Sequence, residues 1–421
     1  MGLLTQASSN LLTLIEIVSK AELPRDDYEH HTFLRANAIP RTALSYNKFN
    51  SLLDYYVTES NSKRRGAAQL AEFRRHWQYV LLCLSQCFFM RRWLCFRLDS
   101  AAYGNNGDYW IKKYKLSRDL TKEIIAYLDG YGLVDCRLGK AYKKGDPMST
   151  RVFPRAVLAA ELLEFFLDIE QPIQPPYVTA NDAEGKWHRI INLGLPTDHP
   201  DKVGMTLIND FLKGHKWACK APVRLVYNAN AFHGGRLITP FQSLPDRSMR
   251  VRINTLIDGQ PIAEVDFNAN HLRLALAVLS NEYAGEAPYE DIAEAAKVEG
   301  RDTVKAFITV AMGAASEKEA ANACGLKGIP RDTFVRLRDG ARKRFPNLPL
   351  FQSWGVVAQN LEGAILRDVM LQGVDKGIVC LPVHDAIAVP RGNEEWALGV
   401  MQEAWQKTTD GIKTRLKVDS I

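Results

Sequence analysis

The sequence contains no apolar run that is long enough to cross a bilayer. Its most apolar segment, residues 80–90, is shorter than the roughly 20 residues that a transmembrane helix needs, and it continues directly into Arg91 and Arg92. The first residues have no basic segment ahead of an apolar run, so we expect no signal peptide. We therefore expect no membrane partner and a cytoplasmic location.

The sequence also lacks paired cysteines at the spacing of a zinc site. Its seven cysteines are scattered. Cys83 and Cys87 are four residues apart in an apolar segment, a pattern that favours small core residues over metal ligands. An odd, scattered set of cysteines is typical of a reducing compartment.

A strong net charge is missing as well, and there is no internal repeat or low-complexity tract. The formal net charge is +6 over 421 residues. This charge permits a polyanionic partner without requiring one. The length is sufficient for two or three domains with substantial cores.

One stretch that does carry a chemical signal is residues 263–279. It begins as a short apolar run that ends at Asp266, and its later leucines have the spacing of a helix. A strand that delivers a carboxylate to the start of a helix can hold a divalent cation rigidly. A lone Asp in this place is also typical of a helix cap.

A second carboxylate interrupts another apolar segment, residues 377–390. His384 and Asp385 stand between two apolar runs, a pattern that predicts a β-hairpin with a polar tip. Burying a carboxylate without a partner is costly. Two strands that each carry an Asp therefore predict one site in which cations offset both charges.

Between these stretches, Arg301 and Lys305 are four residues apart. At helical spacing both cations lie on one face. Two carboxylates beside a cationic helix face are suited to phosphoryl transfer, because metal ions bridge phosphates while Lys and Arg stabilise the charge on the leaving group.

Together these segments resemble the family A polymerases, which include the bacterial DNA polymerase I type and the single-subunit phage RNA polymerases. Residues 263–279 are similar to motif A, 301–313 to motif B on the fingers helix, and 383–385 to motif C. Residues 234–252 are similar to the segment before motif A that contacts primer–template. The resemblance covers roughly the last 200 residues and implies an α+β fold, a right-hand palm with an antiparallel sheet and helical fingers.

The resemblance also implies roles for individual residues. Asp266 and Asp385 would hold two Mg²⁺ ions, for which Mn²⁺ can substitute, and Arg301 and Lys305 would contact the triphosphate. The residues implied in nucleotide binding are Phe267, His271, Thr309, Met312 and Gly313. Those implied in nucleic-acid binding are Arg236, Gln242, Arg247, Arg252, Gln359, Glu362 and His384.

The chain departs from the family pattern at several positions. His271 stands where the family's DNA polymerases carry the Glu that excludes ribonucleotides, so the sugar preference is open. Ala386 replaces the acidic residue that often follows the motif C Asp. Thr309 occupies the usual aromatic position of motif B, and Met312-Gly313 lies one residue closer to Lys305 than expected.

The region before the palm predicts a second nucleic-acid contact. We expect a helix over residues 67–98, then a helix–turn–helix over 110–128 and a basic ribbon over 134–154. This pattern resembles the winged helix of DNA-binding regulators and plasmid replication initiators. The implied DNA contacts are Arg118, Lys122, Lys143 and Lys144. A winged helix used only for protein contacts is the alternative.

Composition shifts divide the chain into four parts. We expect a mostly helical region at 1–100, a winged-helix-like domain at 101–170, a proline-rich linker at 171–176, and the palm and fingers at 177–421.

The resulting hypothesis is a template-directed DNA polymerase of a phage, plasmid or mobile element that acts in a bacterial or phage-infected cell. Its partners would be DNA primer–template and nucleoside triphosphates, with RNA and a replicative helicase as further candidates. We find no exonuclease-like carboxylates, so we expect no proofreading. The alternatives are a primase or RNA polymerase that starts chains without a primer, a DNA-binding replication initiator with a degenerate palm, and a metal-dependent nuclease.

Overall fold

The computed structural model mixes α-helices with mostly antiparallel sheets. It describes residues 23, 31–33, 39–40, 43–89, 92–96, 98, 100–104, 111–112, 115–139, 149–167, 169–181, 190–191, 193–244 and 250–420. The chain forms two compact units, and they divide between Pro172 and Ile173, inside the proline-rich stretch. The first unit also contains Trp217–Ala221 and Ser243–Thr255, while the second contains Ile173–Lys216, Pro222–Gln242 and Leu256–Ile421.

The first unit packs helices against a small sheet. Its strands run in the order β1-β3-β5-β4. The helices are α2 (Ala43–Ser60), α3 (Ala67–Phe89), α5 (Arg118–Gly130) and α6 (Ala156–Leu167). The strands are β1 (His31–Phe33), β3 (Trp93–Phe96), β4 (Val134–Arg137) and β5 (Thr150–Pro154), and β2 (Ile39–Pro40) pairs with β6 (Ile169–Glu170).

The helix predicted over residues 67–98 is shorter in the structure, and a strand follows it. Helix α3 ends at Phe89, and Trp93–Phe96 form strand β3. All four residues of β3 are buried, because this strand lies between β1 and β5 in the sheet. Burial on both faces makes a short apolar run suitable for a central strand, and this tertiary context overrides helix propensity. Strand β3 also joins the two regions that sequence analysis separates at residue 100.

The second unit contains two sheets and a larger set of helices. One sheet has the order β10-β9-β7-β8, and the other has the order β11-β12-β14-β13 with β15 paired to β12. The strands are β7 (Val178–Asn181), β8 (Ile190–Ile191), β9 (Arg224–Asn228), β10 (Asn230–Ile238), β11 (Leu256–Ile257), β12 (Gln260–Phe267), β13 (Leu381–Val383), β14 (Ala386–Pro390) and β15 (Leu416–Ser420). The helices are α7 (Pro200–Leu212), α8 (Asn270–Ser280), α9 (Pro288–Ala296), α10 (Arg301–Gly313), α11 (Glu317–Leu326), α12 (Arg331–Arg344), α13 (Trp354–Lys376) and α14 (Glu394–Thr408).

Strand β12 lies at the centre of its sheet, between β14 and β15, and both pairings are antiparallel. Its middle residues Ile262, Ala263 and Val265 are fully buried, as expected for a central strand rich in apolar side chains. The chain leaves β12 at Phe267 and turns through Ala269 in the left-handed region, at φ 52°, before α8 begins. This strand-to-helix turn holds Asp266 at the end of a rigid strand.

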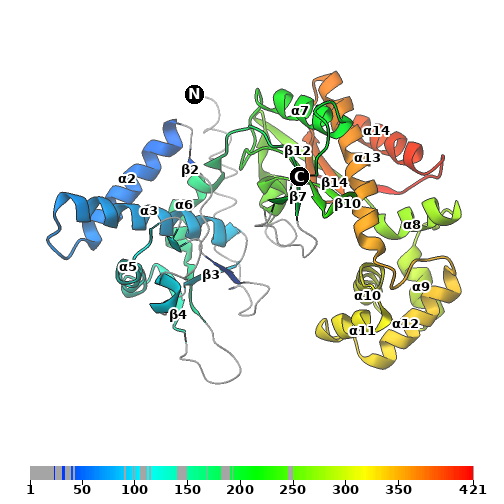
Figure 1. Cartoon of the computed structure of the whole chain (residues 1–421), viewed down its shortest axis with the longest axis horizontal. Coiled ribbons are helices and arrows are strands. Elements are labelled where there is room, and N and C mark those ends of the chain that lie inside the picture. The colour runs from blue at the N-terminus through cyan, green and yellow to red at the C-terminus, as the bar shows by residue number, and fades with distance from the viewer. Residues whose placement is uncertain are drawn as a thin grey trace. The chain divides into compact units, whose positions relative to one another are not determined.

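Helix α13 supports the second unit, and Figure 1 shows it in orange beside β10. It packs on β10 at closest range where two glycines meet. A Cβ built on Gly363 would lie 1.8 Å from the carbonyl oxygen of Gly235. Gly235 itself has φ 75° and lies within an irregular part of the β9–β10 pairing. Gly235 and Gly363 therefore allow the two backbones to approach closely.

Helices α9 to α12 share an apolar cluster with α8 and with the first turns of α13, and Figure 1 shows α9 to α12 gathered below α13. Phe307, Phe334 and Phe345 are fully buried there, and Phe307 packs edge-on against Phe334 with ring centroids 5.4 Å apart. This cluster fixes one face of α10, so the opposite face is presented to solvent.

None of the helices in the described part of the chain is long and apolar enough to cross a membrane.

Candidate active site

Asp266 and Asp385 come from neighbouring strands of the same sheet. In the β12–β14 pairing Asp266 lies opposite Ala386, and the backbone N–H of Phe267 donates to the carbonyl of Asp385 at 3.4 Å. Asp385 follows His384, which has φ 56° at the tip of the β13–β14 hairpin. Two acidic residues that are far apart in the sequence thus have adjacent backbones.

The electrostatics of this pair favour a bound cation. Burial, together with the negative charges of Asp266 and Glu362, raises the pKa of Asp385 to about 7, while His271 acts in the opposite direction. A carboxyl with such a pKa gives up its proton readily only when a positive charge comes close. The site therefore has more negative charge than its neighbours offset.

A lysine that sequence analysis missed lies against Asp266. Lys417 is opposite Asp266 in the β12–β15 pairing, and its Nζ is 2.8 Å from Asp266 Oδ2. The sequence predicts a short edge strand at Val418 and Asp419, but it does not indicate the partner of that strand. The register against β12 is what brings Lys417 to the site.

Glu362 of α13 connects three side chains behind the carboxylates. The Arg236 Nε donates to Glu362 Oε1 at 3.4 Å, and the Asn270 Nδ2 donates to Glu362 Oε2 at 2.9 Å. The His271 Nε2 lies 3.1 Å from the same Oε2. Glu362 is only 2% exposed. The Glu362 carboxylate is thus buried among its own partners, and its contact with nucleic acid stays a prediction.

The exposed face of α10 carries the predicted cations. Arg301, Lys305 and Thr309 are all exposed and recur every four residues. The Thr309 hydroxyl donates to the Lys305 carbonyl at 2.8 Å, and the Arg301 Nε pairs with Glu290 at 3.0 Å. The helix thus presents a cationic stripe to solvent.

Tyr289 of α9 connects this stripe to the carboxylates. The guanidinium of Arg301 lies over the Tyr289 ring, 5.2 Å from its centroid. Burial raises the pKa of Tyr289 to about 12, with Arg301 lowering and Asp385 raising it. The charges of Arg301 on α10 and of Asp385 at the hairpin tip both affect the pKa of Tyr289.

Two residues predicted to bind the nucleotide have buried side chains. Met312 is 2% exposed and belongs to the apolar cluster of α9 to α12. Phe267 is also 2% exposed, and its ring packs on Trp405 with centroids 5.1 Å apart. Each side chain lies on the core-facing side of its element, and the contact of these two residues with a nucleotide stays a prediction. Gly313, one residue after Met312, is exposed.

The residues predicted to contact primer–template have different surroundings. The His384 backbone N–H donates to Gln242 Oε1 at 3.3 Å, so Gln242 supports the hairpin tip. Gln359 on α13 is half-buried. Arg252 belongs to the first unit, where it is 8% exposed and donates to the Leu244 carbonyl at 3.0 Å. The contact of Arg252 with nucleic acid stays a prediction, and Arg247 lies outside the described residues.

Helix α12 is less available to a polyanion than its sequence suggests. Arg338 contacts Glu317 at 2.5 Å and Asp339 at 2.8 Å. Arg344 pairs with Asp291 at 2.8 Å. These arginines form ion pairs with neighbouring acidic side chains. Part of the basic surface of α12 is therefore already neutralised.

The predicted recognition helix of the first unit is α5. Arg118 is half-buried and its Nε donates to the Leu98 carbonyl at 2.6 Å. Thr121 is buried, and its hydroxyl donates to the Ser117 carbonyl. Arg118 is thus used inside the unit, whereas Lys122 is exposed. Lys143 and Lys144 of the predicted wing lie outside the described residues.

The donor set at the two aspartates fits Mg²⁺ better than zinc. Within the described residues, no group of three or more His, Cys, Asp or Glu side chains could hold a metal ion. Mg²⁺ is commonly bound through one or two carboxylates, with water and substrate phosphates completing its shell. Asp266 and Asp385 supply that minimal set and leave positions for phosphate oxygens.

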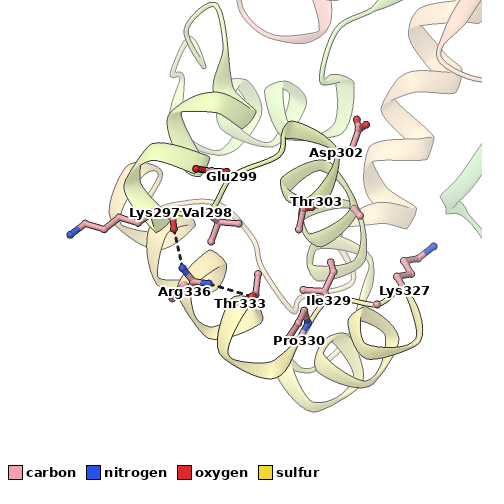
Figure 2. A pocket seen from close by; sticks show the side chains of 12 residues that line it. Lys297, Val298, Glu299, Asp302, Thr303, Lys327, Ile329, Pro330, Thr333 and Arg336 are labelled. Atoms are coloured by element: carbon pink, nitrogen blue, oxygen red, sulfur yellow. Dashed lines mark hydrogen bonds between the residues drawn. The ribbon is translucent and has the colours of Figure 1, made fainter.

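A pocket of about 680 Å³ lies elsewhere in the helical cluster. Figure 2 shows it between the start of α10 and the α11–α12 connection. Lys297, Lys327 and Arg336 contribute positive charge to its wall, and Glu299 and Asp302 contribute negative charge. The Arg336 guanidinium already donates to the Lys297 carbonyl at 2.9 Å. The predicted site residues lie outside this wall.

Comparison with known proteins gives little support beyond this geometry. The sequence matches no protein-family model, and no curated protein matches it. Among solved structures, the chain is similar to the POL domain of Pol1 from M. smegmatis in complex with DNA primer-template and dNTP, with 18% identity and a TM-score of 0.31. This likeness spans 52% of this chain and 51% of that chain. A likeness of this extent establishes neither a shared fold nor a shared function, so the chemistry must be inferred from the residues of the site.

Proposed function

We propose that the chain is a template-directed nucleotidyltransferase that extends a DNA primer. The observation that carries this proposal is that Asp266 near the end of β12 and Asp385 in the β13–β14 turn have adjacent backbones, with the pKa of Asp385 raised to about 7 by burial and by its acidic neighbours. Such a pair is suited to divalent cations and not to an isolated structural role. The cations of α10 and Arg236 are the further residues on which the proposed reaction depends.

Asp266 and Asp385 are the residues that would hold Mg²⁺. When bound, this ion supplies the charge that makes a primer 3′-hydroxyl more acidic and offsets the charge of a triphosphate. The carboxylates themselves fix the position of the cation, because each is held at a strand end within one sheet. Their role is orientation as much as charge.

Arg301 and Lys305 would act on the triphosphate. Both are exposed on one face of α10, and Tyr289 connects Arg301 to the environment of Asp385. Positive side chains in this position stabilise the charge that develops on a pyrophosphate leaving group. A nuclease that hydrolyses nucleic acid has no triphosphate for this stripe to bind, so the stripe favours nucleotidyl transfer.

Arg236 is the best candidate for a contact with the primer–template. Its side chain is partly exposed while its Nε remains on Glu362, so the guanidinium is held in one place. We further propose that Lys122 of the first unit contacts DNA and that the protein works without proofreading, in a phage, plasmid or mobile element whose helicase opens the template.

Primer extension with Mg²⁺ tests the proposed function. Asp266→Asn and Asp385→Asn should each lower the rate by at least about 10²–10³-fold, because the charge that holds the cation is lost. Asp302→Asn is the matched control, since Asp302 is exposed on α10 and lines the separate pocket; it should retain the wild-type rate. A wild-type protein that binds primer–template but adds no nucleotide would instead support the replication initiator with a degenerate palm.

A primase or RNA polymerase is the second candidate, and His271 is the observation that favours it. The imidazole lies beside Glu362, so this position carries a hydrogen-bonding ring held by a carboxylate. A polar ring can tolerate a 2′-hydroxyl where a carboxylate gate would not. Chain synthesis from ribonucleotides alone on single-stranded template would select this candidate, and strict dependence on a primer and deoxyribonucleotides would reject it.

A further inference from the structure

The last strand of the chain places an ammonium group on one of the two aspartates. In the antiparallel pairing of β12 and β15, Lys417 is directly opposite Asp266, and side chains that are directly opposite share one face of the sheet. The Lys417 Nζ lies 2.8 Å from Asp266 Oδ2. Asp385 and Asp419 add further attraction to the same ammonium.

Lys417 and a divalent cation need the same oxygen. A Mg²⁺ ion lies about 2.1 Å from each oxygen that binds it and demands nearly ideal octahedral geometry. An ammonium hydrogen-bonded to Asp266 Oδ2 occupies part of that shell. Because the Lys417 side chain is 63% exposed while Asp266 is 26% exposed, the lysine has solvent to move into and the aspartate does not.

We propose that Lys417 is a built-in counter-ion of the cation site, which neutralises Asp266 in the cation-free protein and leaves that oxygen when a divalent cation binds. This inference rests on the cation site of the proposed function and adds a residue to it. Cation binding is then an exchange of one positive charge for another, and Lys417 lowers the apparent affinity of the site. The released ammonium stays at the sheet edge and no covalent step is involved.

Isothermal titration with Mg²⁺ alone, and separately with Mn²⁺ alone, tests the exchange without any catalytic readout. Lys417→Ala should bind each cation roughly two- to fivefold more tightly than wild type, as expected from removing a largely exposed ion pair that competes for one ligand. Lys417→Arg should keep an affinity close to that of wild type.

Lys413→Ala is the matched control, because Lys413 is also exposed and lies just before β15. It removes the same net charge without removing the contact with Asp266. If Lys413→Ala tightens cation binding as much as Lys417→Ala, or if Lys417→Ala leaves the affinity unchanged, the exchange is wrong.

A double-mutant cycle shows whether the ion pair gives way to the cation. Asp266→Asn and Lys417→Ala, alone and together, are compared by thermal unfolding in the presence of a chelator and then at saturating Mg²⁺. The two substitutions should be coupled in chelator and additive with Mg²⁺, because the contact exists only in the cation-free state. Equal coupling in both conditions, or none in chelator, would contradict the exchange.

The failure of this inference can be told apart from the failure of the proposed function. If wild type binds Mg²⁺, Lys417→Ala binds it more tightly, and neither extends a primer, then the exchange stands and the polymerase function fails. If wild type extends primers and Lys417→Ala shows unchanged affinity, the function stands and the exchange fails. If wild type binds no divalent cation, both are overturned.

Discussion

The buried carboxylate of Glu362 connects three polar side chains next to the two aspartates. Asn270 and Arg236 donate to it, and His271 lies within hydrogen-bonding distance. A charged group buried to this degree is tolerated because donors surround it. Glu362 therefore holds Asn270 and Arg236 in place.

Replacement of Glu362 by alanine should lower the free energy of unfolding by about 1–3 kcal/mol, because the buried Asn270 amide loses its acceptor. Glu362→Gln should cost less, since an amide oxygen can still accept. Denaturant unfolding measures both. The control is Glu403→Ala on the exposed face of α14, which should change stability by no more than about 0.5 kcal/mol. Equal effects of Glu362→Ala and Glu403→Ala would contradict the role of the buried network.

Single residues of the site differ in how far the sequence can predict them. Asp266 and Asp385 are predictable because each ends or interrupts an apolar run, and that pattern is local. The contact of Lys417 with Asp266 depends on the register of β15 against β12, and the burial of Glu362 depends on how α13 packs. Neither has a local signal, so the sequence indicates neither the contact of Lys417 nor the burial of Glu362.

At the scale of elements, the close packing of α13 on β10 positions Glu362. This packing needs a hydrogen atom in place of a side chain at Gly363, where a Cβ would clash with the Gly235 carbonyl. The sequence of α13 does not indicate which strand the helix covers. The glycines of β10 signal a close approach without identifying what approaches.

Gly363→Ala should therefore lower the free energy of unfolding by about 3 kcal/mol or more, because neither backbone can yield without moving the helix. The matched control is Gly399→Ala in α14, where an added Cβ would meet nothing within 4 Å. That change should stabilise the helix by up to about 1 kcal/mol. Thermal unfolding of both variants measures the difference, and a Gly363→Ala protein as stable as wild type would show that the packing is wrong.

His76 joins two elements of the first unit. The backbone N–H of Ser117, just before α5, donates to its Nε2 at 2.6 Å, while Nδ1 lies 2.8 Å from the Glu72 carbonyl. Burial lowers the pKa of His76 below its usual value. The neutral ring accepts the Ser117 hydrogen bond, and a protonated ring cannot.

The stability contributed by neutral His76 is fully present above the pKa of an unfolded histidine, near 6.5, and is lost as pH falls through that value towards the lower folded-state pKa. The melting temperature of wild type should therefore fall between pH 7.5 and 5.5. His76→Gln, which does not titrate, should show a smaller fall over the same range. Identical pH profiles for the two proteins would argue against a neutral buried imidazole at this position.

At the scale of the whole molecule, the mild charge of +6 is less informative than where the cations are placed. Arginines of α12 pair with Glu317, Asp339 and Asp291, whereas Lys305 of α10 is exposed. Composition alone weights both helices equally. The structure distinguishes α12, where several arginines are paired with acidic side chains, from α10, where Lys305 is exposed.

The central claim is that the two aspartates on neighbouring strands support nucleotide addition directed by a template. Its most direct test is single-nucleotide addition to one primer on four templates that differ only in the first unpaired base, with Mg²⁺ and all four deoxynucleotides. The wild-type protein should add the complementary nucleotide in each case, and both Asp266→Asn and Asp385→Asn should add none. Addition that ignores the templating base, or that survives both substitutions, would contradict the account.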